Sequence, residues 1–252
     1  MKRQRMILCL ITMGALFFGG CMAGCSESVV SEDIGTGSIY SEMLVEVTSS
    51  GDTEVTVELN VGSRTGPNIE LSAGDRLTAS MLGTTQPLNI RTSWPHGVEY
   101  ETLLAGNPPG EVVTIAFERD DFVDAPNSEV EVPETFSIMA PAAQEQFSMQ
   151  DEISLEWTPA GTQDEMLISF EILCQEGDDR VGDTINFTRT DSGLEVFRVE
   201  DLIGDWEITS AYACGADIVI TRKHTGVVDP GYGKGGEIFS LRSESVSVQL
   251  NP

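Results

Sequence analysis

The chain has 252 residues, and its 41 Asp plus Glu outnumber its 14 Lys plus Arg, giving a net charge of −27. So acidic a surface excludes nucleic acid as a partner, because binding to nucleic acid depends on Lys and Arg that neutralise phosphates. Hydrophobic residues make up 40% of the chain, which favours folded domains over the disorder common in acidic sequences.

Residues 1–25 have the composition of a secretory signal peptide. Three basic residues precede an apolar run, Met6–Phe18, which is shorter than the roughly 20 residues that a membrane-spanning helix needs. Small residues and two cysteines follow, and this segment resembles the bacterial lipobox, in which a cysteine after small residues is lipidated. The resemblance implies that the protein is exported and anchored in a membrane by lipid.

Two cysteines compete for the lipid, Cys25 and Cys21. Cys25 follows the more typical Ala23-Gly24, whereas Cys21 lies directly behind the apolar run. Processing at Cys25 also leaves a single pair of cysteines in an oxidising compartment. We therefore expect Cys25 to carry the lipid, with Cys21 as the alternative, and acyl chains to hold the protein permanently on its membrane.

Removal of residues 1–25 deletes three bases and no acids, so the mature part carries 11 − 41 = −30 charges. Its only lysines are Lys223 and Lys234. A surface rich in acids and poor in lysine suits a salty medium, because salt screens the repulsion between its charges. Residues 26–38 are polar and acidic, and we expect them to form a short flexible stalk.

From Ile39 onwards the pattern is that of β-strands. In Glu54–Leu59, apolar and polar residues alternate with a period of two, as in a sheet with one solvated face. Turn signals such as Gly51-Asp52 and Gly66-Pro67 separate the strands. The strands expected in residues 39–132 are Met43–Val47, Glu54–Leu59, Asn68–Leu71, Asp75–Met81, Leu88–Thr92, Val98–Leu104, Val112–Phe117 and Ser128–Val132. So many short strands without a helix predict an antiparallel β-sandwich.

An acidic loop follows Phe117. Its Asp120, Asp121, Asp124 and Asn127 carry the oxygen ligands that Ca²⁺ prefers. Their spacing differs from the Asp-x-Asp-x-Asp-Gly series of known calcium loops. We therefore expect a solvated acidic turn, with a Ca²⁺ site as the alternative. No other cofactor is expected.

Val132-Pro133-Glu134 marks a domain junction, because proline stops strand pairing and the pattern restarts behind it. In residues 133–252, Ile153, Leu155 and Trp157 share one face of a strand, so Trp157 is expected to anchor the core. The other expected strands there are Thr135–Met139, Met166–Leu173, Thr184–Thr188, Leu194–Val199, Trp206–Ala213, Ile218–Arg222, Glu237–Leu241 and Ser245–Leu250. The fold class is thus all-β, with two tandem antiparallel sandwiches.

Cys174 and Cys214 each end a predicted strand, and we expect them to form a structural disulfide. The chain has no Cys-x-x-Cys, which argues against redox chemistry, and two Cys with two distant His make a weak zinc set.

The segment Arg222–Gly236 is the least acidic of the protein. It gathers Arg222, Lys223, His224, Tyr232 and Lys234, a candidate contact patch for an acidic ligand. The alternative is a long hairpin whose bases pair with neighbouring acids. Gly233-Lys234-Gly235-Gly236 does not fit a phosphate-binding loop, which ends in Lys-Ser/Thr and opens a helix.

Motifs of hydrolytic enzymes are missing from the sequence. It contains neither Gly-x-Ser-x-Gly nor His-Glu-x-x-His. We therefore expect a protein that is not an enzyme.

The C-terminal half resembles immunoglobulin- and fibronectin-type sandwiches, and more narrowly a group of uncharacterised bacterial exported lipoproteins. The resemblance depends on Ala140-Pro141-Ala142, on Asp151–Gly161 and on Thr221–Gly236, and extends more loosely from Tyr40 to the C-terminus. It implies an envelope location and a β architecture, and it assigns no activity and no functional residue. Trp157 precedes both cysteines, which differs from immunoglobulin domains.

The sequence therefore predicts a non-enzymatic lipoprotein of the cell envelope, a spacer or an adhesion-type binding module. Its partners would be the membrane, through the N-terminal lipid, and an envelope protein or glycan. The alternative is a Ca²⁺-dependent carbohydrate-binding or hydrolytic exported protein that uses the acidic loops.

Overall fold

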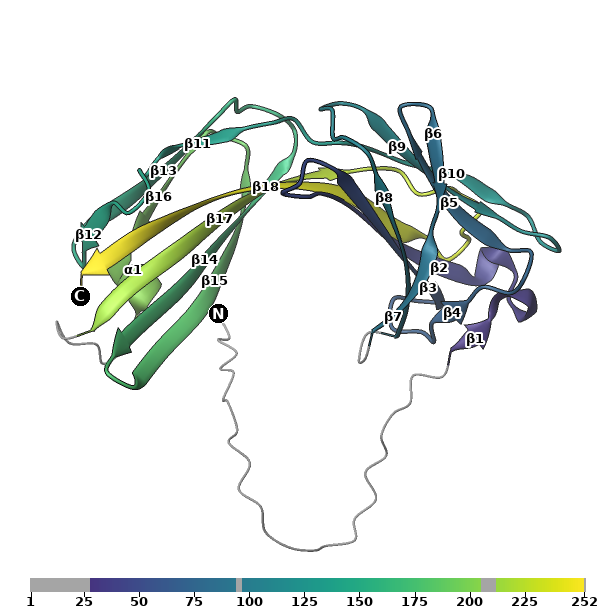
Figure 1. Ribbon diagram of the computed structural model, residues 1–252, viewed down its shortest axis with the longest axis horizontal. Coiled ribbons are helices and arrows are strands. Elements are labelled where there is room, and N and C mark those ends of the chain that lie inside the picture. The colour runs from purple at the N-terminus through teal and green to yellow at the C-terminus, as the bar shows by residue number, and fades with distance from the viewer. Residues whose placement is uncertain (1–27, 94–96, 205–211, 252) are drawn as a thin grey trace, which may run out of the picture.

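The computed structural model describes residues 28–93, 97–204 and 212–251, and nearly all of its regular elements are β-strands (Figure 1). Buried and solvent-accessible side chains alternate along the longer strands. In β3 (Thr53–Val61), Val55, Val57 and Leu59 are buried, while Glu54 and the other polar residues between them reach solvent. The fold class predicted from this period of two, all-β, is confirmed.

The largest sheet contains nine strands. Eight of them lie in the spatial order β15 (Asp179–Thr190), β14 (Glu165–Glu176), β17 (Ala213–Thr225), β18 (Gly236–Asn251), β2 (Ile39–Val47), β3, β8 (Gly97–Leu104) and β7 (Asn89–Ser93). The ninth, β12 (Gln146–Ser148), pairs in parallel with the end of β18.

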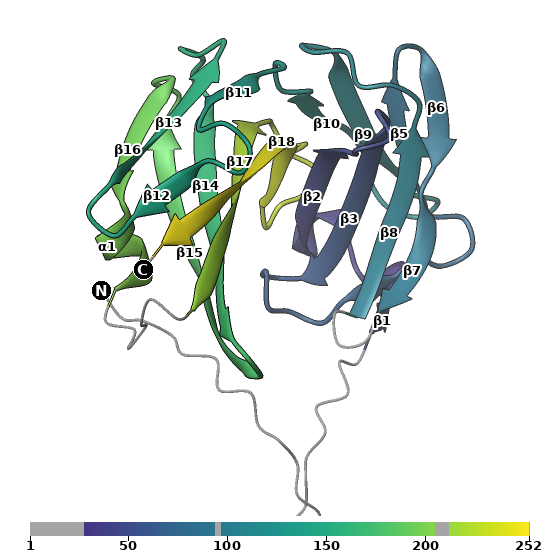
Figure 2. The same ribbon diagram turned by 60° about the vertical axis from the view of Figure 1, so that its left-hand side comes forward.

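Two smaller sheets cover one face of this large sheet (Figures 1 and 2). One has the order β10 (Ala125–Glu131), β9 (Val112–Glu118), β5 (Arg76–Met81) and β6 (Thr84–Pro87), and the other has the order β11 (Ser137–Ala140), β13 (Glu152–Thr158) and β16 (Leu194–Arg198). The remaining elements are the parallel pair β1 (Val29–Val30) and β4 (Ile69–Glu70), two 3₁₀ turns at Ser31–Asp33 and Thr36–Ser38, and the short helix α1 (Val199–Ile203). Within the described ranges, no helix has the length and apolarity to cross a membrane.

Apolar side chains between the sheets form two separate cores. The first contains residues such as Val57 and Phe117 from the N-terminal half, together with Tyr232 and Ile238 from the C-terminal half. The second contains Trp157, whose expected role as a core anchor agrees with its burial, among residues of the C-terminal half alone. The first core therefore depends on residues that come late in the chain.

The strand β18 joins the two halves into one sheet. Gly236–Leu241 pairs in parallel with β2, while Phe239–Leu250 pairs in antiparallel fashion with β17. One continuous sheet therefore contains strands from both sides of Val132-Pro133, and one of its pairings is parallel. Two separate antiparallel sandwiches would share no sheet and would have no parallel pair. A sequence pattern reports which residues face a core, but it does not report which distant strands pair. The division into modules 39–132 and 133–252 stays a prediction.

Two arginines fix the connection between the halves. Arg222 and Arg242 are direct cross-strand neighbours on β17 and β18. Arg242 Nε donates to the Pro133 carbonyl (2.8 Å), and Arg222 Nη1 donates to the Glu134 carbonyl (3.0 Å). The polypeptide between the two cores thus lies on the hairpin formed by the last two strands.

Residues 28–38 are folded in the structure, in contrast to the flexible stalk expected over 26–38. Ser31 and Thr36 are buried. The buried Arg119 donates to the Ser31 carbonyl (2.6 Å), the Ile34 carbonyl (3.1 Å) and Thr36 Oγ1 (3.2 Å). One buried guanidinium therefore fixes a segment whose own composition is typical of a linker.

Candidate functional site

One face of the large sheet is left uncovered by the two smaller sheets. Figure 1 shows the two smaller sheets on the outer side of the large one, so that β2, β3 and β8 present their other face to solvent. On β2 and β3 most core-facing positions are apolar, and four of the positions on the other face carry carboxylates: Glu42, Glu46, Glu54 and Glu58. The alternation seen in the sequence therefore produces an acidic sheet surface.

Carboxylates on this surface lie directly opposite one another across neighbouring strands. Glu42 on β2 pairs with Glu58 on β3 and with Glu237 on β18, and Glu46 pairs with Glu54. Like charges directly opposite each other destabilise a sheet. Such an arrangement concentrates negative potential on one face.

Few positive charges balance these acids. Arg64 contacts Glu42 (2.5 Å) and Glu237 (3.2 Å), and the side-chain amides of Asn60 and Asn68 donate to Glu58. Burial raises the pKa of Glu42; the Arg64 charge opposes that rise, while Glu58 and Glu237 add to it. The pKa of Glu42 is thus held above the ordinary value of a glutamate.

A shallow groove of about 390 Å³ lies on this side, where strand β7 begins. Because β7 starts at Asn89, opposite Glu101, residues beyond Glu101 on β8 have no β7 partner. The groove is lined by Glu54, Asn89, Glu101, Thr102 and Leu103. Two carboxylates, an amide and a half-exposed leucine can receive a cationic or hydroxyl-rich group that has an apolar neighbour.

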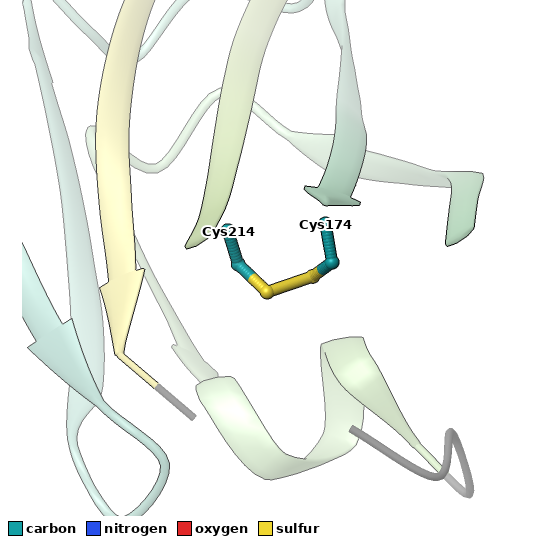
Figure 3. The surroundings of a disulfide bond; sticks show 2 residues. All are labelled: Cys174 and Cys214. Carbon is teal, nitrogen blue, oxygen red and sulfur yellow. A yellow bond between two sulfur atoms is a disulfide. The ribbon is translucent and has the colours of Figure 1, made fainter. Parts of the chain in front are cut away.

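The disulfide expected between Cys174 and Cys214 is present (Figure 3). The two cysteines are directly opposite each other on β14 and β17, with Cα atoms 4.0 Å apart. The bond therefore joins neighbouring strands of one sheet, and it does not join two facing sheets as the bond of immunoglobulin domains does. Lipidation of Cys25 or Cys21 lies outside the described residues.

The structure does not bring all five residues of the candidate basic patch to the surface. Arg222 is fully buried, and Tyr232 is buried in the first core, where its ring stacks on Phe117 with centroids 6.2 Å apart. Lys223 pairs with Glu165 (3.3 Å), and His224 Nδ1 contacts Asp164 (2.7 Å). Lys234 is exposed in the loop before β18. Arg222, Lys223 and His224 thus pair with acids, in agreement with the alternative interpretation as a hairpin.

The candidate calcium residues do not converge. Asp124 Oδ1 accepts a bond from the Arg119 backbone N–H, so this carboxylate serves the loop itself. The Asn127 backbone N–H donates to Asp229. The Asp120 backbone N–H donates to Asp75. Across the described ranges, no three His, Cys, Asp or Glu side chains are grouped as metal ligands would be.

A buried polar network in the C-terminal half was missed by the sequence reasoning. Asp191 accepts from Trp157 Nε1 (2.7 Å), Thr162 Oγ1 (2.6 Å) and Arg222 Nη2 (2.9 Å). The guanidinium of Arg222 also lies over the Phe136 ring, 4.9 Å from its centroid. Arg222 lies on the same face of β17 as the buried Ile218 and Ile220, because it follows them at intervals of two residues. This alternation in the sequence could have indicated that Arg222 is buried.

Comparison with known proteins gives no family assignment. No family model matches the chain, and no curated protein matches it. Solved structures similar to it include the fibronectin(III)-like modules of Clostridium thermocellum CbhA, with 10% identity over 84% of this chain and 90% of that chain and a TM-score of 0.25.

Two further similar structures come from other bacteria. The Yersinia pseudotuberculosis adhesin InvE shares 14% identity over 86% of this chain and 61% of that chain, with a TM-score of 0.22. The Bacteroides ovatus protein SGBP-B of a mixed-linkage glucan utilization locus, in complex with a heptasaccharide, shares 10% identity over 84% of this chain and 60% of that chain, with a TM-score of 0.21. At these TM-scores we draw no conclusion from the similarities.

Proposed function

We propose that the chain is a non-enzymatic lipoprotein of the bacterial cell envelope, made of two tandem β-sandwich modules, that acts as a binding or adhesion module. Support for the anchor comes from the signal-peptide pattern of residues 1–25 and from the cysteines at its end, Cys25 or Cys21. Support for binding comes from the uncovered acidic face of the large sheet and its groove.

The distance between the anchor and the folded part limits how the protein sits on its membrane. The described fold begins at Ser28, three residues after Cys25. An extended chain spans at most about 3.6 Å per residue, so a lipid on Cys25 lies within about 11 Å of Ser28. The N-terminal half would then lie close to the membrane surface, which favours a binding role over that of a spacer on a long stalk.

The groove beside Glu54 and Glu101 is the observation that carries the binding role. Its carboxylates have the charge to attract Lys- or Arg-rich segments of another envelope protein, and its amide and carboxylate oxygens can accept bonds from sugar hydroxyls. Arg91 contacts Glu101 (2.8 Å) at the same place and would be displaced by a cationic partner.

Binding of a Lys/Arg-rich peptide and of neutral oligosaccharides to the full chain in detergent tests this role. The double variant E54Q/E101Q should weaken peptide binding several-fold, because both groove charges are removed. The matched control E129Q/E156Q removes two exposed charges from the outer sheets and should change binding little. Equal losses in both variants would show that net charge alone attracts the peptide and would contradict a site in the groove.

Mass spectrometry of the N-terminal peptide tests the anchor. An acylated cysteine at position 25 is expected, and its loss in C25A, with Cys21 unmodified, would assign the lipid to Cys25. Lipid that persists in C25A and disappears in C21A would assign it to Cys21. An unmodified N-terminus after cleavage would contradict the anchor.

A further inference from the structure

The strand β15 forms one edge of the large sheet along its whole length. All its residues from Asp179 to Thr190 pair with β14 in a single register without a bulge. On its other side, no strand of the described ranges pairs with it. A long regular edge presents unpaired backbone N–H and C=O groups to other strands, and natural proteins usually protect such edges with bulges, Pro or Lys.

This edge carries few of those protections. The strand contains neither Pro nor Lys, and its backbone is regular. Its charged residues on the core side, Asp183 and Arg189, have opposite signs and can therefore pair across an edge instead of blocking it. Ile185 and Phe187 point towards the second core and are only partly buried there, while Thr184, Asn186 and Thr188 are exposed on the open face. The Asp179 end contacts Tyr212, whose hydroxyl donates to the Asp179 carboxylate (2.7 Å), so the segment Gly182–Thr190 is the part available for pairing.

The sequence of this segment is complementary to itself. When two copies run antiparallel about a two-fold axis at Asn186, Asp183 lies opposite Arg189 of the other copy, and this pair occurs twice. Ile185 then lies opposite Phe187, and Thr184 opposite Thr188, again twice each. Opposite charges, aromatic with β-branched residues, and Thr with Thr are the cross-strand pairs that stabilise antiparallel strands.

Other registers do not give this match. A two-fold axis perpendicular to the sheet keeps core-facing residues opposite core-facing residues, so the register can change only in steps of two. One step in either direction places Arg189 opposite Val181 or opposite Ile185. In the register centred on Asn186, each core-facing pair from Asp183 to Arg189 joins opposite charges or two apolar residues.

We propose that two copies of this chain associate through antiparallel pairing of their β15 strands, centred on Asn186. The pairing extends the large sheet across the two-fold axis and covers Ile185 and Phe187 of each copy. Arg189 is already at the strand, because its Nη1 donates to the Thr188 carbonyl (3.0 Å) and its Nε contacts Glu195 (3.2 Å). Its guanidinium is therefore placed beside the backbone that the Asp183 of a second copy would approach.

Charge reversal tests the register directly. Sedimentation velocity of the full chain in excess detergent, over roughly 1–100 µM, should show a dimer for the wild type. The variants D183R and R189D should each be monomeric, since each puts like charges opposite one another at both ends. Mixed in equal amounts, the two variants should form a heterodimer. The arginine introduced by D183R then faces the aspartate introduced by R189D, and at the other end the unchanged Arg189 of the first variant faces the unchanged Asp183 of the second.

The variant R180D is the matched control, because it reverses a charge on the same strand outside the paired segment and should leave the dimer intact. Cysteine crosslinking is independent of the charges: N186C should form a disulfide-linked dimer on oxidation, and T190C, which faces Gly182, should not. A monomeric wild type, no heterodimer in the mixture, equal disruption by R180D, or equal crosslinking of both cysteine variants would overturn the proposal. If a charge variant fails to fold by thermal melt, the crosslinking result decides.

Discussion

Arg222 and Asp191 form an ion pair, 2.9 Å between Nη2 and Oδ2, in which both side chains are completely inaccessible to solvent. The pair connects β17 to the loop before β16, and through the carbonyls of Glu134 and Pro159 it also fixes the start of the C-terminal half. A buried pair of this kind is costly to break, because removal of one partner leaves the other charge without a counterion.

We therefore expect R222M to lower the free energy of unfolding by about 3–5 kcal/mol. Urea denaturation measures the effect. The control R198M removes an arginine from exposed ion pairs with Glu152 and Glu200, and should cost about 1 kcal/mol or less. If both variants lowered the free energy of unfolding equally, burial of the Arg222–Asp191 pair would not increase the cost of breaking it.

The same pair predicts a loss of stability in acid. Burial raises the pKa of Asp191, but hydrogen bonds from Thr162 and Trp157 and the charge of Arg222 outweigh it and hold the pKa below its usual value. A carboxyl with a lowered folded-state pKa contributes stability above its unfolded pKa, near 3.8, and loses it as the pH falls towards the folded value. Stability of D191N, measured in urea from pH 6 to about pH 2, should fall less steeply than that of the wild type. If the stability of both proteins fell equally with pH, Asp191 would not be the group responsible for the loss in acid.

The hydrogen bonds of Arg119 to residues 31–36 predict that this segment opens more readily when the arginine is removed. The variant R119M removes every hydrogen bond from the guanidinium to residues 31–36, so amide exchange of residues 28–38 should accelerate by about tenfold or more. Exchange in β14 should stay unchanged, because β14 belongs to the second core. The exposed Arg76, which pairs with Glu118, provides the control variant R76M. Unchanged exchange of residues 28–38 in R119M would mean that other contacts suffice to hold the segment.

The disulfide predicts sensitivity to reduction. A crosslink that closes a loop of 40 residues stabilises by about 4 kcal/mol on the chain-entropy model. The paired variant C174S/C214S, or the wild type in a reductant, should lose roughly this much in urea denaturation. A loss below about 1 kcal/mol would contradict this model, because the crosslink would then restrict the unfolded chain very little.

The facing carboxylates predict a salt-dependent gain in stability from removal of one charge. Glu46 and Glu54 are directly opposite each other, and E46Q should raise Tm by a few degrees at low ionic strength. The gain should fade in about 1 M NaCl, where the Debye length is about 3 Å. In the control E156Q, the acid lies opposite Leu194, so little change is expected. A gain that persists in salt would rule out repulsion as its cause.

Local pattern predicted most strands because alternation and turn residues are short-range properties. Val98–Leu104 and Val112–Phe117 nearly match β8 and β9, whereas β6 was missed because Thr84–Pro87 is polar and ends in proline. The predicted strand Trp206–Ala213 lies mostly outside the described residues. The parallel pairing of β18 with β2 had no local signal, because it joins segments almost 200 residues apart.

The site was less predictable than the fold. The pairing of Cys174 with Cys214 followed from the number of cysteines. The opposition of Glu42 to Glu58 requires the register, which the sequence does not record. Arg222 and Tyr232 looked like surface residues because their residue types are usually exposed, and their burial depends on partners, Asp191 and Phe117, that are distant in sequence.

The N-terminal half of the protein cannot complete its folding before the strand β18 has been synthesised. Strand β2 lacks one of its two neighbours until Gly236–Leu241 has been synthesised, and the first core lacks Tyr232 and Ile238 until the same moment. Pairing at such long sequence separation is intrinsically slow, because the loop must close before any contact stabilises it. During the export that we propose, the N-terminal half would therefore keep an unpaired edge at β2 until the last strand has emerged. A chaperone that shields strand edges would have to bind β2 for longer than other edges, because the partner strand β18 comes last in the chain.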